Sequence, residues 1–145
     1  MLTLSAMMAG FCLIAIQSLN VCEGLLSSKA FGVSLKGAAS ERDRVVILGD
    51  FESANSLNFY APVQLMVING RADSIERGLK YPDAPRLIIS RDYLESLWQG
   101  PGRTFLLGRN DQIASLGIGP SFTVLDYSGR RLISNQPLGS KARFP

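Results

Sequence analysis

The residues best suited to chemistry follow a short apolar run in the first half of the chain. The run "VVIL" (45–48) ends at a glycine, and Asp50, Glu52, Asn55 and Ser56 come shortly after it. In open α/β sheets, ligands bind beyond the carboxyl ends of the strands, where such a segment would lie. Paired carboxylates can hold a divalent cation or transfer protons. These four polar residues are therefore our candidate ligand-binding residues.

The two carboxylates also have a purely structural explanation. Residues 52–61, "ESANSLNFYA", form a predicted helix that Pro62 ends. Acidic side chains near a helix N-terminus are favourable by a few tenths to about 1 kcal/mol, because they face the positive end of the helix dipole. The single glycine of "LGDFES" gives neither a phosphate-loop nor a dinucleotide-binding fingerprint. The residues alone leave both explanations of Asp50 and Glu52 open.

Composition removes several kinds of chemistry. The chain of 145 residues contains no histidine, so the commonest general base and the commonest zinc ligand are absent. The only cysteines, Cys12 and Cys22, precede residue 23, so the rest of the chain has neither a disulfide framework nor thiolate ligands. A net charge of +3 does not favour a nucleic acid partner, which usually requires clustered basic residues. We predict no metal site and no cofactor in this chain.

The N-terminal residues are strongly apolar. No charged side chain occurs before Glu23, and the stretch is close to the ~20 residues that cross a hydrocarbon core. We therefore predict a transmembrane helix over residues 1–22, with the lipid bilayer as its partner. A signal peptide is less favoured because no basic residue precedes the apolar run. An ordinary buried helix is the remaining alternative.

The rest of the chain alternates between strand and helix patterns. Short apolar runs predict strands, and capped segments with an apolar stripe predict helices, with Ser90 and Asn110 as caps. We expect strands over 44–49, 63–68, 86–90 and 103–109, helices over 52–61, 90–100 and 110–119, and a hairpin over 121–136 around "YSGR".

This order of elements predicts the fold class and the domain organisation. Alternating strands and helices indicate a small layered α/β domain over residues 44–136, with a mostly parallel sheet and a C-terminal antiparallel hairpin. Residues 23–43 are predicted to be a juxtamembrane connector with a helical part. Residues 137–145 are predicted to be a tail.

Several stretches resemble a known protein family. The spellings "LLSSKAFG" (25–32), "YPDAP" (81–85), "LESLWQGPGRTFLLG" (94–108) and, above all, residues 45–70 are similar to the C-terminal region of bacterial membrane glycosyltransferases of family 39. That group is related to protein O-mannosyltransferases and to the lipid A aminoarabinose transferase. The family's "G-x-(Y/F)-E-S…S-L-x-F-Y" element is matched by Gly49, Phe51, Glu52, Ser53, Ser56, Leu57, Phe59 and Tyr60.

The resemblance implies a specific function. In the family, a Ser-Ser-Lys element links the last transmembrane helix to an extracytoplasmic α/β domain, and Ser27, Ser28 and Lys29 match it. Such enzymes move a sugar from a polyprenyl-phosphate donor to lipid or protein outside the cytoplasmic membrane. Their catalytic carboxylates lie in the first extracytoplasmic loop, which this sequence lacks, and a divalent metal would belong to the full-length family. The resemblance therefore carries over no catalytic residue, but it implies that Lys29 meets a lipid phosphate.

Three functions follow from these observations. The first is a C-terminal module of a membrane glycosyltransferase, inactive alone, in the inner membrane with a periplasmic α/β domain. Its partners would be the polyprenyl-phosphate sugar and the transmembrane part of the transferase. The second is a membrane-anchored extracytoplasmic binding module without enzymatic activity. The third is a small enzyme that uses Asp50 and Glu52, which the absence of histidine makes less favoured.

Overall fold

The computed structural model describes residues 2–54, 56–61, 63–70 and 78–138, and these form an α/β fold around one six-stranded sheet. The strand order is β3-β2-β1-β4-β6-β5. The strands are β1 Arg44–Leu48, β2 Gln64–Ile68, β3 Ile88–Ile89, β4 Thr104–Arg109, β5 Phe122–Tyr127 and β6 Arg130–Ser134. Strands β1 to β4 pair in parallel, whereas β6 pairs antiparallel with β4 and β5 pairs antiparallel with β6. The predicted fold class, a mostly parallel sheet with a C-terminal antiparallel hairpin, is confirmed.

Helices cover the sheet on both faces. They are α2 Lys29–Ala38 and α3 Leu57–Tyr60 on one face, and α4 Arg91–Gln99 and α5 Asn110–Leu116 on the other. Successive side chains of a strand point to opposite faces. Val45 and Phe105 therefore pack in the cluster with α2 and α3, whereas Val46 and Leu106 pack in the cluster with α4 and α5. This two-sided burial explains why the central strands are continuous apolar runs without alternation.

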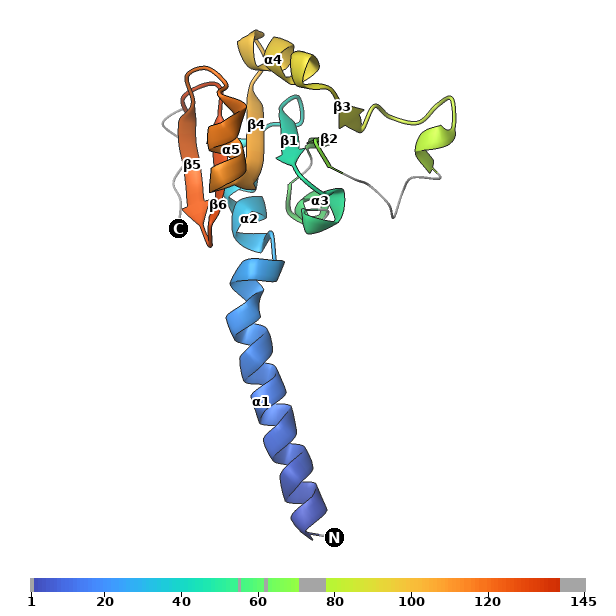
Figure 1. The fold of residues 1–145 in the computed structure, drawn as a ribbon, viewed down its shortest axis with the longest axis vertical. Helices are drawn as coiled ribbons and strands as arrows, with labels where there is room; N and C mark the ends of the chain where they lie inside the picture. Colours follow the sequence, from blue (N-terminus) through green and yellow to red (C-terminus); the bar gives the residue numbers. More distant parts are fainter. Residues whose placement is uncertain (1, 55, 62, 71–77, 139–145) are drawn as a thin grey trace.

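A long helix, α1 Leu2–Leu26, precedes the α/β domain and extends away from it (Figure 1). Large apolar side chains on this helix are exposed: Met7, Met8, Phe11, Leu13, Ile14, Ile16 and Leu19. Within the part of the chain that the structure describes, no helix is both long and apolar enough to cross a membrane. The transmembrane helix predicted over residues 1–22 is therefore not found in the described part of the chain, where α1 is an exposed apolar helix.

The connection between α1 and the domain is mostly helical. Helix α1 continues past residue 22 to Leu26, two serines interrupt the helix, and α2 begins at Lys29. The Lys29 backbone N–H donates to Ser27 Oγ at 3.1 Å, which satisfies one of the amide groups left without a partner at a helix start. The predicted connector over residues 23–43 thus contains the end of α1 and all of α2.

Two predicted helices differ from the observed ones. Residues 52–61 do not form one helix, because the chain makes a 3₁₀ turn at Phe51–Ser53 and then the short α3. Polar side chains such as those of "SANS" compete with the helix for backbone hydrogen bonds, which weakens a continuous helix there. In α5 the capping position is Arg109, and the predicted cap Asn110 is already helical. The third strand is also shorter than predicted.

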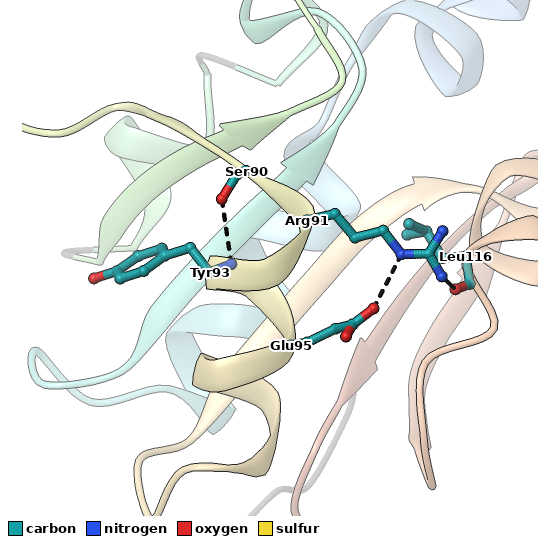
Figure 2. A network of polar contacts seen from close by, with 5 residues as sticks. All are labelled: Ser90, Arg91, Tyr93, Glu95 and Leu116. Carbon is teal, nitrogen blue, oxygen red and sulfur yellow. Dashed lines mark hydrogen bonds and ion pairs between the residues drawn. The ribbon is translucent and has the colours of Figure 1, made fainter.

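Helix α4 forms as predicted, and its polar contacts cap its own N-terminus and hold α5 beside it (Figure 2). Ser90 Oγ accepts the backbone N–H of Tyr93 at 3.3 Å, as expected of an N-terminal cap. Arg91 donates through Nε to Glu95 Oε1 at 3.0 Å and through Nη2 to the carbonyl of Leu116 at 2.6 Å. The last turn of α5 is thereby held against α4.

A close approach between α2 and α3 generates a first prediction. A Cβ added at Gly32 would lie 2.5 Å from Cβ of Tyr60, whereas a Cβ at Gly37 of the same helix would meet nothing within 4 Å. Gly32→Ala should lower the free energy of unfolding by about 1–3 kcal/mol, because α2 must shift from α3. Gly37→Ala should be neutral or stabilising by up to about 1 kcal/mol, since alanine is the better helix former. Urea unfolding of both variants tests this, and equal effects would contradict it.

Candidate functional site

The predicted ligand-binding residues lie at the carboxyl ends of the parallel strands. Asp50 follows β1, Glu52 lies in the 3₁₀ turn, and Ser56 directly precedes α3. Both carboxylates are exposed, and Ser56 is partly buried. The fourth candidate, Asn55, lies outside the described residues. The structure therefore places Asp50, Glu52 and Ser56 where ligands of open α/β sheets bind.

The turn that follows β1 is fixed by backbone contacts. Gly49 has φ +113°, a conformation that favours glycine. Its N–H donates to the carbonyl of Ile68 at the end of β2, at 3.1 Å. Gly70 leaves no room for a Cβ against the Gly49 carbonyl, so the chain after β1 and the chain after β2 lie in direct contact. The backbone just before Asp50 is therefore held against the end of β2.

Lys29, the first residue of α2, belongs to the same edge of the sheet. Its side chain is exposed, and α2 packs against α3 through Gly32 and Tyr60. The edge therefore combines one basic residue from α2 with two acidic residues from the segment between β1 and α3. Lys29, Asp50 and Glu52 each make further interactions within the protein.

Arg130 is a residue of this edge that the sequence did not indicate. It begins β6, directly after the hairpin turn, and its Nη1 donates to Ser28 Oγ at 3.3 Å. Its guanidinium carbon lies 5.1 Å from the ring centroid of Phe31, and the Phe31 ring meets the Tyr127 ring edge-on at 6.4 Å. Ser28 and Phe31 are fully buried. The hairpin is thus attached to the start of α2 by a cation stacked on an aromatic ring.

The environment of Arg130 keeps a cation beside the Ser-Ser-Lys element. Burial lowers the pKa of Arg130 from its ordinary value, because removal from water penalises the charged form. An arginine starts from so high a pKa that it remains protonated at neutral pH. Sequence patterns gave no signal for the contact, since Ser28 and Arg130 are 102 residues apart.

The start of α2 has the chemistry of an anion site. Lys29 is the first residue of α2 and the Arg130 guanidinium contacts the preceding Ser28, so two basic residues flank the positive end of the α2 dipole, a combination that suits an anion such as phosphate. A metal site is less well supported. Among the described residues, no three or more histidine, cysteine, aspartate or glutamate side chains group together to hold a metal ion.

The fold is a three-layer α/β domain, with one sheet between two layers of helices, and it follows a long apolar helix. No protein-family model matches the sequence, and no curated protein sequence matches it. The fold occurs in solved structures of ArnT from Cupriavidus metallidurans. The crystal structure in the apo state has a TM-score of 0.56 and 18% identity, and the match covers 80% of this chain and 20% of that chain.

A second ArnT crystal structure, bound to undecaprenyl phosphate, has a TM-score of 0.56 and 16% identity, with coverage of 86% of this chain and 21% of that chain. The chain therefore spans about a fifth of the length of these ArnT chains. At such identities the likeness shows the fold alone, and it does not establish membership of family 39.

The Arg130 contacts predict a measurable contribution to stability. Arg130→Met should lower the free energy of unfolding by about 1–3 kcal/mol, because the buried Ser28 hydroxyl loses this donor and Phe31 loses its cation. Arg109→Met serves as the control, since Arg109 is exposed and pairs with the exposed Asp111 at 2.9 Å. Urea unfolding should show little change for the control. A loss of similar size in both variants would argue against a special role of Arg130.

The hairpin carries a pH-dependent contact at Asp126. Hydrogen bonds from Arg131, and secondarily from Asn110, lower the pKa of Asp126 below its ordinary value. A depressed pKa means that the contact stabilises the fold above the pKa of the unfolded chain and is lost as pH falls through the folded pKa. Asp126→Asn should therefore lower the urea midpoint at pH 7, and the difference from wild type should vanish in acid. Asp83→Asn, an exposed loop change, should show no difference at either pH.

Proposed function

We propose that this chain is a C-terminal module of a membrane glycosyltransferase that uses a polyprenyl-phosphate-linked sugar. In this proposal the chain is inactive alone and needs the remaining part of the transferase. Its place is the inner membrane, with the α/β domain on the extracytoplasmic side. The observation that supports the proposal is the shared fold with ArnT, which is an aminoarabinose transferase.

The extent of the match adds to this support. Residues 29–145 amount to about four fifths of the chain, and the match to the second ArnT structure covers 86% of it, so that match includes part of residues 1–28. The likeness thus extends from the α/β domain into the α1 region. A helix that leads into such a domain is the arrangement that the family resemblance implies.

Polyprenyl phosphate is the proposed ligand of the edge that carries Lys29. One of the two ArnT structures is bound to undecaprenyl phosphate, which has the same chemistry. In this chain the exposed Lys29 ammonium and the start of α2 offer charge and backbone donors to a phosphate. Asp50, Glu52, Asn55 and Ser56 remain proposed ligand contacts on the neighbouring segment.

Sugar transfer in reconstituted membranes tests the proposal. A polyprenyl-phosphate sugar donor is supplied to this chain alone and to this chain with the product of the adjacent upstream reading frame. Transfer only in the second case is the expected result. Transfer by this chain alone would contradict the proposed dependence and favour a small enzyme that uses Asp50 and Glu52. Transfer in neither case would favour a membrane-anchored binding module.

Lys29 provides a sharper test within the same assay. Lys29→Ala should raise the donor concentration needed for half-maximal transfer by about tenfold, since one charge-assisted contact to a phosphate is lost. Lys36→Ala removes the same charge from the other end of α2 and should leave transfer unchanged. Lys29→Arg should restore most of the activity. Unchanged donor use in Lys29→Ala would remove Lys29 from the proposed site.

A further inference from the structure

A second polar site lies at the opposite edge of the sheet. A cavity of about 500 Å³ opens where α2 ends and where β1 and β4 begin. Its lining includes Ala38, Ser40, Arg42, Asp43, Arg103 and Gln136. Helix α1 and Lys29 lie at the other end of α2, so this cavity is separate from the proposed phosphate-binding edge.

Arg103 is the central group of the cavity. Its Nη1 donates to the carbonyl of Ala38 at 3.2 Å, and its Nη2 donates to the carbonyl of Pro137 at 3.4 Å. The Nε atom is buried and has no acceptor among the described residues. Among the residues that the structure describes, no carboxylate forms an ion pair with the Arg103 guanidinium. A cation that contacts only neutral carbonyls retains an unmet preference for an anion.

The contact with Ala38 has a structural role, because a cation at the C-terminus of α2 neutralises carbonyls that have no partner in the helix. That role accounts for Nη1 but not for the buried Nε. A guanidinium has five N–H donors, and the two carbonyl contacts use only part of them. The buried Nε–H does not face the cavity, so the donors that a ligand could meet are the remaining N–H groups of Nη1 and Nη2.

Arg42 adds a second cation to the cavity. It is exposed and makes no polar contact within the described residues. The acidic residue of the lining, Asp43, is buried, and its Oδ2 accepts the Ser40 backbone N–H at 2.8 Å. This hydrogen bond ties Asp43 to its own turn. Two arginines and one aspartate leave the cavity with a net positive charge.

We propose that this cavity binds a phosphate or carboxylate group of a water-soluble molecule. Guanidinium groups bind both kinds of anion through paired N–H donors. The cavity is wide open to solvent and is larger than one such group, so it can admit the anionic group of a larger molecule. The hydroxyl of Ser40 offers a polar contact to the rest of the ligand, whereas Nε2 of Gln136 already donates to the Pro101 carbonyl at 2.9 Å. The position far from α1 favours a soluble ligand over a lipid headgroup.

Nuclear magnetic resonance of the full chain tests the proposal. Inorganic phosphate and citrate are titrated at constant ionic strength, with chloride as the reference anion. We expect saturable shifts of the Ser40 and Gly102 amides and of the Arg103 side-chain N–H, with a dissociation constant of about 1 mM or below for at least one anion. Vesicles of phosphatidylglycerol are added in a parallel experiment, and only shifts of the same Ser40 and Gly102 amides are read, because α1 can itself bind a vesicle.

Arg42→Gln is the decisive variant because this exposed side chain is not needed for folding. It should weaken anion binding about tenfold, which corresponds to the loss of one charge-assisted contact. Arg86→Gln removes the same charge at an exposed position outside the cavity, over the Tyr93 ring, and should leave binding unchanged. The proposal would be overturned if neither anion gave saturable shifts, or if both variants weakened anion binding equally. It would also be overturned if the cavity amides shifted with vesicles and with neither soluble anion. Sugar transfer is not measured, so the result is independent of the proposed function.

Discussion

Two-sided burial of the central strands is the constraint on which the rest of the structure depends. β1 and β4 are adjacent and parallel, and their side chains are buried alternately on opposite faces. Parallel strands need a crossover between them, so the chain must pass over a face of the sheet each time it returns. Helices α2 and α3 cover one face and α4 and α5 cover the other. The long apolar runs and the layered architecture are consequences of one requirement.

The same arrangement separates two polar edges. Helix α2 runs along the sheet with its start near Arg130, at the carboxyl end of β4, and its end near Arg103, at the amino end. Lys29 and Asp50 therefore share the first edge, whereas Arg42 and Arg103 share the second. A helix dipole places positive potential at its start and negative potential at its end. In the proposed anion sites, the dipole of α2 would favour an anion at the first edge, whereas at the second edge the arginines would have to outweigh it.

The sequence was sufficient for features that depend on local pattern. Apolar runs located β1, β2 and β4, the "YSGR" turn located the hairpin, and Ser90 was the correct cap of α4, because burial, turns and caps each depend on a few neighbouring residues. The helix over 52–61 and the cap at Asn110 were wrong, since tertiary packing overrides weak local preference in short segments. The contacts Arg130–Ser28 and Arg103–Ala38 join residues 102 and 65 positions apart. No local pattern encodes such pairs, so the second site was not predictable.

Helix α1 differs from the α/β domain in how its apolar surface is satisfied. The domain buries its apolar side chains on both faces of the sheet, whereas α1 leaves Phe11 and Ile14 about two-thirds exposed, at 69% and 68%. Contiguous apolar surface of this kind marks an interaction with another apolar partner. The domain therefore buries its own hydrophobic core, whereas the apolar side chains of α1 are not covered by the described residues. In the proposed function, the rest of the transferase would cover this exposed face of α1.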